Sequence, residues 1–417
     1  MGDVPGIQTL SQVQATEGAA AGERALVVGR MLATASEAFL HALRSPIRTS
    51  SDLSKAAGVN KDIASRFLTA LGKRDPLAVV YYMPGVESLR RLSRGARTRA
   101  ANVEAVQQFE EAIEAFEGLL QDELGGRHAL DAMASAWLPE ARERFEAASR
   151  QMAFRAAANL RGVEAQTIID TALIHPGSDP DRYDAVTIQG IIGVRRLRPK
   201  VSLTIATYDH RDDTAGRPAL TIDGRPVRGP DQPDELLPQF GQGDPLALSV
   251  VRSGTTKGYQ LVGEALGAGA ASDVFFGLYS LGLFRKWARM PGDIAAQMEA
   301  VEVPAQRLVL DILLHEDVWP GLEPELMLYN TCGRGPALPY DRTRDGDRVD
   351  LLDSSRLVGR GIDCCRVAEI PRYIELLRWT CEQRGWDPAK FRVFRCDSRH
   401  PVVGVQYVMG FRLAMKP

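Results

Sequence analysis

The chain has few of the features that mark secreted or membrane proteins. Its 417 residues include only five cysteines, and none of them forms a CxxC pair. An odd number of scattered cysteines in a long chain is typical of reduced thiols in the cytoplasm. The first 22 residues have neither a basic start nor an apolar run, which predicts no signal peptide. The nearly uncharged stretch from Ala265 to Phe284 contains Asp273 and four glycines, which favours a buried segment over a membrane span.

Motifs of common enzyme classes are also missing. The sequence contains no nucleophile elbow, no P-loop and no zinc-ligand spacing. His315, Glu316 and Asp317 are adjacent, but no second histidine stands at ligand spacing, so we interpret them as turn residues. The vicinal Cys364 and Cys365 are interpreted as structural thiols. The sequence therefore predicts no catalytic residue, no metal and no cofactor.

Charge is unevenly distributed along the chain. Between Arg44 and Arg99 there are 12 Lys and Arg but only four acids, an excess of eight positive charges in a chain whose net charge is −2. The remaining residues are therefore acidic. A basic module attached to an acidic body is typical of nucleic-acid binding, although a solvated charged face gives the same pattern.

Hydrophobic periodicity divides the N-terminal part into short helices. We expect a mobile tail over residues 1–22 and a first helix over 23–44, followed by a short helix that Ser50 or Ser51 caps. Asn60 can cap the next helix, which would run to about Lys73. The run PLAVVYYMPG predicts one strand, and because a wing needs a hairpin, we expect the wing to be short or absent. We therefore expect a helical module over residues 23–99, followed by a helical connector over residues 100–162.

The connector has a heptad-like stripe. Its apolar residues are spaced alternately three and four apart, which is typical of a helix seam. Because packing on the chain's own domain needs the same stripe, a dimer seam is one of two interpretations. The residues of the stripe are Val106, Phe109, Ile113, Phe116 and Leu120.

From about residue 163 onwards, apolar runs rich in Val, Ile, Leu and Tyr alternate with Pro, Gly and Asp. These runs predict strands, and the patterns near 283–300 and 370–384 predict helices. We therefore expect a mixed α/β body over residues 163–417. The whole chain is assigned to the α+β class.

The stretch LSKAAGVNKDIASRFLTAL resembles the helix-turn-helix of bacterial transcription regulators of the repressor type. The resemblance rests on Ala57-Gly58-Val59 at the turn and on Ser65-Arg66 in the second helix. It covers about 25 residues closely. The sequence departs from the pattern at Ser54, where alanine is usual, and at Ala64, where valine or isoleucine is usual.

This resemblance implies a set of DNA contacts, because the second helix of such a motif lies in the major groove. Exposed polar residues on that helix would contact base edges, and donors around it would contact phosphates. The expected base contacts are Asn60, Lys61, Ser65 and Arg66. The expected phosphate contacts are Thr49, Ser50, Ser51, Lys55, Lys73 and Arg74, and Arg90, Arg94 and Arg97 could extend the basic track.

We therefore expect a cytoplasmic, homodimeric transcriptional regulator that binds double-stranded DNA and does not bind membranes. The 163–417 body would then sense a small-molecule effector or support assembly. The alternative is an enzyme of the small-molecule transferase type, whose helix-turn-helix only dimerises. Such an enzyme needs a glycine-rich nucleotide loop, and the nearest candidate, at Gly267 and Gly269, lacks the acidic residue expected about 20 positions later. A structural assembly protein is a third interpretation.

Overall fold

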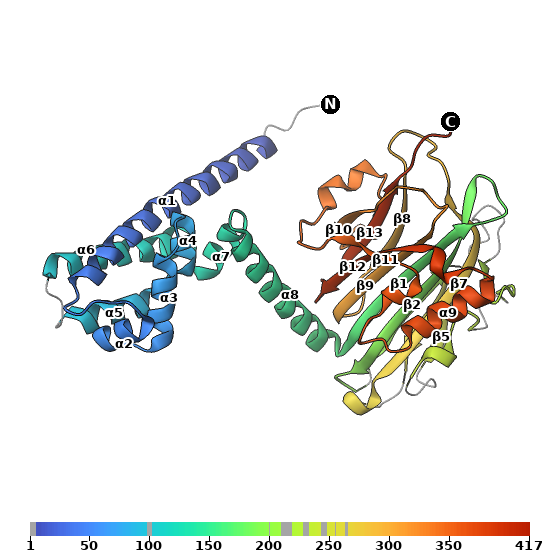
Figure 1. Cartoon of the computed structure of the whole chain (residues 1–417), viewed down its shortest axis with the longest axis horizontal. Coiled ribbons are helices and arrows are strands. Elements are labelled where there is room, and N and C mark those ends of the chain that lie inside the picture. The colour runs from blue at the N-terminus through green and yellow to red at the C-terminus, as the bar shows by residue number, and fades with distance from the viewer. Residues whose placement is uncertain are drawn as a thin grey trace. The chain divides into compact units, whose positions relative to one another are not determined.

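The computed structural model describes residues 6–97, 102–199, 201–209, 219–227, 233–242, 248–254, 256–262 and 266–417. The chain divides into two compact units, Met1–Glu146 and Ala147–Pro417. The first is helical and the second is built on sheets, so the α+β class is confirmed (Figure 1). Among the described residues, no helix combines the length and apolar character that crossing a bilayer requires.

The helical unit is organised around one long helix. Its elements are α1 (Gly6–Ala42), α2 (Ser50–Ala57), α3 (Lys61–Leu71), α4 (Pro76–Tyr82), α5 (Val86–Arg97), α6 (Val103–Gly118), a π-helical turn at Leu119–Glu123, α7 (Arg127–Ser135) and the start of α8 (Pro139–Arg161). Helix α1 contacts both α4 and α6. The approach to α4 is close, because a methyl group at Gly29 would lie 2.1 Å from the carbonyl oxygen of Pro76.

Three sequence-based expectations for this unit are wrong. Helix α1 begins at Gly6, so residues 6–22 are helical rather than a tail, while residues 1–5 lie outside the described residues. The run Pro76–Tyr82 is helix α4 rather than a strand, because Asp75 caps it and Pro76 occupies its first turn. The described residues of this unit contain no strand, which agrees with the expectation of a short or absent wing. Thr49, rather than Ser50 or Ser51, caps α2.

The five stripe residues of α6 and the following turn do not form a seam for a partner. Each of these side chains is at most 8% exposed and belongs to the core of its own unit. The ring of Phe109 stacks on Phe39 of α1 at 4.4 Å and meets Phe67 of α3 edge-on at 5.7 Å. The stripe therefore holds the helical unit together, and the expected dimer seam is corrected. The unit also extends past the expected boundary at residue 99, which lies outside the described residues, to Glu146.

The second unit contains three sheets, and its first strand begins at Val163, where the change of sequence character predicts it. The largest sheet has the order β11-β12-β9-β1-β2-β7-β4, and the smaller ones are β10-β13-β8 and β3-β6-β5. Strands β1 and β9 are parallel, and the other pairs are antiparallel. The bounds are β1 (Val163–Pro176), β2 (Arg182–Arg196), β3 (Leu203–Asp209), β4 (Ala219–Leu220), β5 (Leu248–Ser253), β6 (Thr256–Leu261), β7 (Ser272–Arg285), β8 (Ile294–Ala300), β9 (Ala305–His315), β10 (Glu325–Asn330), β11 (Ser355–Arg360), β12 (Phe391–Arg399) and β13 (Val405–Arg412).

Side chains of β1 alternate between two cores. Ile168 and Ala172 pack with the β13 residues Tyr407 and Met409, whereas Ile169 packs on the other face with α9 (Tyr373–Arg384). The large sheet is thus covered by the β10-β13-β8 sheet on one face and by α9 on the other (Figure 1). The helix expected near 370–384 is confirmed. The helix expected near 283–300 is wrong, because that segment contains the end of β7 and all of β8.

Candidate functional site

Helices α2 and α3 meet at a tight turn whose geometry the sequence dictates. Gly58 has φ of +67°, a left-handed conformation that favours glycine. The hydroxyl of Ser54 donates to the carbonyl oxygen of Val59 at 2.6 Å, so the serine that departs from the usual alanine stabilises the turn. Asn60 then caps α3 by accepting a hydrogen bond from the backbone N–H of Ile63 at 2.8 Å. The angle between the two helices is therefore fixed by local hydrogen bonds.

The start of α2 is held by a reciprocal cap. The Thr49 hydroxyl accepts from the Asp52 N–H at 3.2 Å, and the Asp52 carboxylate accepts from the Thr49 N–H at 2.8 Å. The Thr49 hydroxyl also donates to the Asp52 carboxylate at 2.9 Å, and this bond, together with the one from the Thr49 N–H, lowers the pKa of Asp52 from its usual value. Thr49, an expected phosphate contact, is exposed, but its hydroxyl is engaged in the cap of α2 through its hydrogen bond to Asp52.

Helix α3 separates an apolar face from a polar one. Ala64, Phe67 and Ala70 are fully buried, so the small Ala64 fits the core where larger residues are usual. The four residues expected to contact bases are all exposed: Asn60, Lys61, Ser65 and Arg66. The structure therefore brings the expected polar residues together on the outer face of one helix. The amide oxygen of Asn60 accepts the capping bond, so the NH₂ group of this exposed residue is the part that could donate to a base.

The expected phosphate contacts divide into two groups. Lys55 and Arg74 are exposed, as is Thr49, whereas Ser50 and Ser51 are half-buried. Lys73 is half-buried as well, with its ammonium 4.3 Å from the centre of the Tyr82 ring and 3.6 Å from a carboxylate oxygen of Glu140. Lys73 is thus already engaged within the helical unit.

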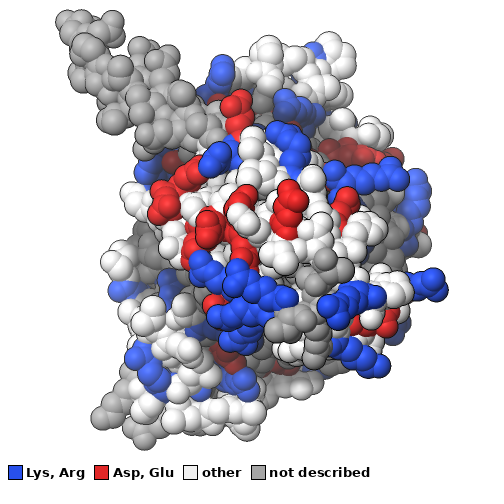
Figure 2. Space-filling view, turned by 90° about the vertical axis from the view of Figure 1, so that its left-hand side faces the viewer, with Lys and Arg blue, Asp and Glu red and all other residues white. Residues whose placement is uncertain are grey.

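The arginines of α5 do not extend a free basic track. Arg90 forms an ion pair with Glu117. Arg97 pairs with Glu110 at 2.7 Å, and Arg94 pairs with Glu87 at 2.7 Å. Figure 2 shows acidic side chains beside basic ones on the face that it draws. The positive excess of this part of the sequence is therefore partly neutralised by acids that folding brings next to it.

A hollow of about 580 Å³ adjoins the polar face of α3. Ser65, Arg66 and Thr69 form one wall. The opposite wall includes Tyr82 and Arg144, whose guanidinium lies 5.4 Å from the centre of that ring. Arg127 also lines the hollow and donates to the carbonyl oxygen of Met83 at 2.9 Å. The hollow adds two arginines to the surroundings of Arg66 that the sequence pattern does not identify.

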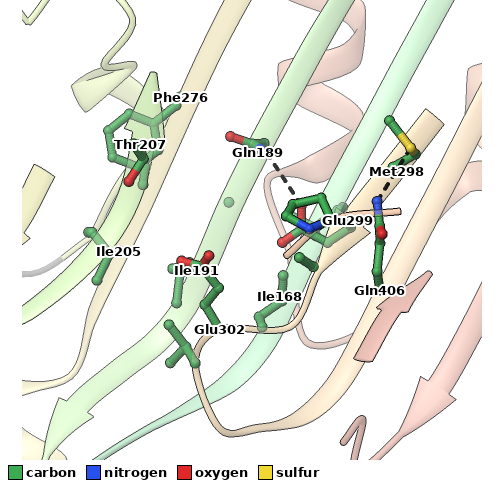
Figure 3. A pocket seen from close by; sticks show the side chains of 16 residues that line it. Ile168, Gln189, Ile191, Ile205, Thr207, Phe276, Met298, Glu299, Glu302 and Gln406 are labelled. Atoms are coloured by element: carbon green, nitrogen blue, oxygen red, sulfur yellow. Dashed lines mark hydrogen bonds between the residues drawn. The ribbon is translucent and has the colours of Figure 1, made fainter. Parts of the chain in front are cut away.

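The sheet unit contains a second candidate site that sequence reasoning missed. A cavity of about 290 Å³ is lined by residues of β1, β2, β3, β7, β8 and β13. Its apolar wall includes Ile168, Ile191, Ile205, Phe276 and Met298 (Figure 3). Its polar residues are Gln189, Thr207, Glu299, Glu302 and Gln406. Among the described residues that line it, none is Lys or Arg.

Two carboxyl groups interact at this cavity. Asp170 is fully buried on the cavity face of β1, where Ile168 also lies, and it is paired across the strands with Gln189. Burial raises the pKa of Asp170 to about 6, and burial together with Asp170 raises the pKa of Glu299 well above its usual value. At neutral pH the pair therefore retains a proton or gains a positive partner.

Amide and hydroxyl groups organise these acids. Gln189 donates to Glu299 at 3.3 Å (Figure 3) and accepts from the Tyr208 hydroxyl at 3.1 Å. Gln297 donates to Oδ1 of Asp170 at 2.8 Å. No amide or hydroxyl donor of the described residues reaches the buried Oδ2 atom of Asp170. The carboxyl groups of Asp170 and Glu299 hydrogen-bond each other through a shared proton. The only sequence signal for this arrangement is an acid within an apolar strand, TIIDTALI.

A further buried acid and the glycine-rich stretch have structural roles. Asp311 lies in the core on the α9 face, where it accepts two bonds of 2.7 Å from Arg395 and one of 2.8 Å from Tyr373. Gly267 precedes a short 3₁₀ turn and Gly269 lies within it. This turn leads into β7, so the two glycines do not lie between a strand and a helix. Among the described residues, no three His, Cys, Asp or Glu side chains converge to hold a metal ion.

Comparisons with known proteins give no family. No family model and no curated protein sequence matches the chain. A solved structure described as a putative protease from Parabacteroides distasonis ATCC 8503 is similar over 60% of this chain, with 8% identity and a TM-score of 0.24. The match covers 40% of the length of that structure. A likeness at this level identifies neither a shared fold nor a shared activity.

Proposed function

We propose that the chain is a cytoplasmic DNA-binding transcriptional regulator that binds double-stranded DNA through α3. The observation that supports this proposal is the two-sided character of that helix. Its buried face packs Ala64, Phe67 and Ala70, while Lys61 and Arg66 are exposed on the other side. A helix held rigidly on a core and presenting donors to solvent has the form needed to enter a major groove.

The proposed chemistry is direct reading of base edges. The guanidinium of Arg66 can donate two bonds to O6 and N7 of guanine, and the ammonium of Lys61 can donate to the same atoms. The exposed Lys55 and Arg74 would contact phosphates, which position the protein without reading sequence. The adjoining hollow brings Arg144 near Arg66, and this arginine would add a further phosphate contact.

Two copies of the chain would place two α3 helices on half-sites about 34 Å apart, one turn of DNA. The contact between the copies would have to use a surface other than the α6 stripe, because that stripe is buried. An effector bound by the sheet unit would change DNA affinity only if it favoured one spacing of the two helices over another.

The test is anisotropy of labelled duplexes selected by the protein from a random pool, measured at several salt concentrations. We expect Arg66→Ala to weaken binding to the selected duplex by about 10- to 100-fold, because one bidentate contact contributes on the order of 1–3 kcal/mol. Affinity for the selected duplex should also fall steeply as salt rises. Arg94→Ala is the matched control, since Arg94 pairs with Glu87 on α5, and it should bind like the wild type.

Equal affinity for selected and random duplexes, unchanged by Arg66→Ala, would contradict the proposal. The α2–α3 corner would then be an architectural element, as in an enzyme that uses such a corner only to dimerise.

A further inference from the structure

We propose that the cavity of the sheet unit is a binding site for a small organic cation, an ammonium or guanidinium group carried on an apolar body. This inference is independent of DNA binding, because it concerns only residues of the second unit. The feature that carries it is a half-apolar cavity that is lined by Glu299 and Glu302 and, among the described residues, by no Lys or Arg.

The acids supply the recognition of positive charge. Glu299 is half-buried and lines the cavity, and Glu302 lies at its exposed rim. Asp170 lies on the same face of the sheet as the cavity and shares a proton with Glu299 through a side-chain hydrogen bond. An N–H donor of a bound cation would take the place of this proton at Glu299 and form a charge-assisted hydrogen bond with the carboxylate.

Among the described residues, the donors that contact Asp170 and Glu299 are neutral amides. Two buried positive groups of the sheet unit are paired with other acids. Lys257 is fully buried and donates to Glu235 at 2.8 Å, and the guanidinium of Arg395 contacts Asp311 on the α9 face. The amide of Gln189 donates to Glu299, and the amide of Gln297 donates to Asp170. The Tyr208 hydroxyl donates to Gln189 and is thus connected to the acids only through that residue. A ligand would therefore supply the missing positive charge.

The apolar wall selects an organic cation over a metal ion. Ile168, Ile191, Ile205 and Phe276 line the cavity together with the two glutamates, and Figure 3 labels all six residues. Hard metal ions need several oxygen ligands around one point, which the described residues do not provide. An aliphatic or aromatic body attached to the charged group would bury its surface against this wall instead.

Proton competition gives the site a defined pH dependence. The pKa of both acids is raised, so at low pH the pair holds protons that oppose a bound cation. Affinity should therefore rise with pH, because the cation replaces protons, and it should level off once the pair is ionised. The charge of Asp311 acts on Asp170 and that of Glu302 acts on Glu299, and both also favour retention of the proton.

The experiment is isothermal titration of the full chain with phenethylammonium at pH 8. Two probes of the same shape are the controls, 2-phenylethanol without charge and 3-phenylpropionate with negative charge. We expect the ammonium to bind at least about tenfold more tightly than the alcohol, with an affinity in the millimolar range or better for so small a ligand. The propionate should not bind.

Variants locate the site. Glu299→Gln should reduce the preference for the ammonium over the alcohol to within about threefold, because it removes the partner charge. Glu323→Gln, an exposed glutamate that does not line the cavity, is the matched control and should bind like the wild type. Thermal unfolding verifies that both variants fold.

Three results would overturn the proposal. They are equal binding of the ammonium and the alcohol, an unchanged preference in Glu299→Gln, and no heat from the ammonium up to about 10 mM, which exceeds the millimolar affinity that its size supports. A stronger response to Mg²⁺ or Ca²⁺ than to the ammonium would replace the organic cation with a metal ion.

Discussion

The two units of this protein differ in whether they bury charged side chains. In the helical unit the described Lys, Arg, Asp and Glu side chains lie at or near the surface, and the centre is a cluster of the rings Phe39, Phe67 and Phe109. In the sheet unit the ion pairs Asp311–Arg395 and Glu235–Lys257 are buried within the fold. Apolar packing depends little on pH, whereas buried charges couple stability to protonation. Substitutions and changes of pH should therefore affect the stability of the two units differently.

The largest expected effect is at a buried charge of the sheet unit. Asp311→Ala removes the acceptor of three hydrogen bonds and leaves the guanidinium of Arg395 buried without its counter-charge. We expect a loss of about 5 kcal/mol in the free energy of unfolding, measured by urea denaturation. Asp363→Ala is the control, because it breaks an exposed pair with Arg378 and should cost less than about 1 kcal/mol. A similar loss in both variants would show that burial of the pair makes no difference.

The helical unit should respond instead to the loss of an aromatic ring. Phe109→Ala removes a fully buried ring from its contacts with Phe39 and Phe67. We expect a loss of about 4 kcal/mol in the free energy of unfolding, because a cavity replaces the ring. Light scattering under folding conditions should give the same particle mass as the wild type. A change of mass without a loss of stability would instead indicate that the α6 stripe contacts a partner.

The smallest expected effect is a pH-dependent one. The raised pKa of Glu299 and Asp170 means that the folded state holds protons which the unfolded chain releases. Their contribution to stability is thus greatest at low pH, and it is lost as the pH rises through about 6 for Asp170 and beyond. Glu299→Gln, which resembles the protonated acid, should therefore gain stability over the wild type as the pH increases from 4 to 8. We expect a gain on the order of 1–3 kcal/mol, measured by urea denaturation. A stability difference that stays constant across this range would contradict the assignment.

Part of the architecture is predictable from sequence because it depends on local geometry. The turn at Gly58 and the cap at Asn60 follow from residues within a few positions of each other, so the α2–α3 corner and its exposed residues were predicted. The start of the sheet unit at Val163 and helix α9 follow from periodicity in the same way. The run Pro76–Tyr82 was predicted as a strand because of its β-branched and aromatic residues, but a cap at Asp75 and packing against α1 made it helical.

The sequence by itself determined local features: the helix corner at Gly58 and the cap of α3 at Asn60. Only the tertiary structure decided which surfaces are free. It buried the α6 stripe, paired the arginines of α5 with acids of the same unit, and placed Glu299 beside Asp170 from a position 129 residues later in the chain. Short-range hydrogen bonds and periodicity can be recognised along a sequence because their partners are near neighbours. Burial and the charge of a site depend on residues far apart in the chain, and their proximity exists only after the sheets and helices have packed.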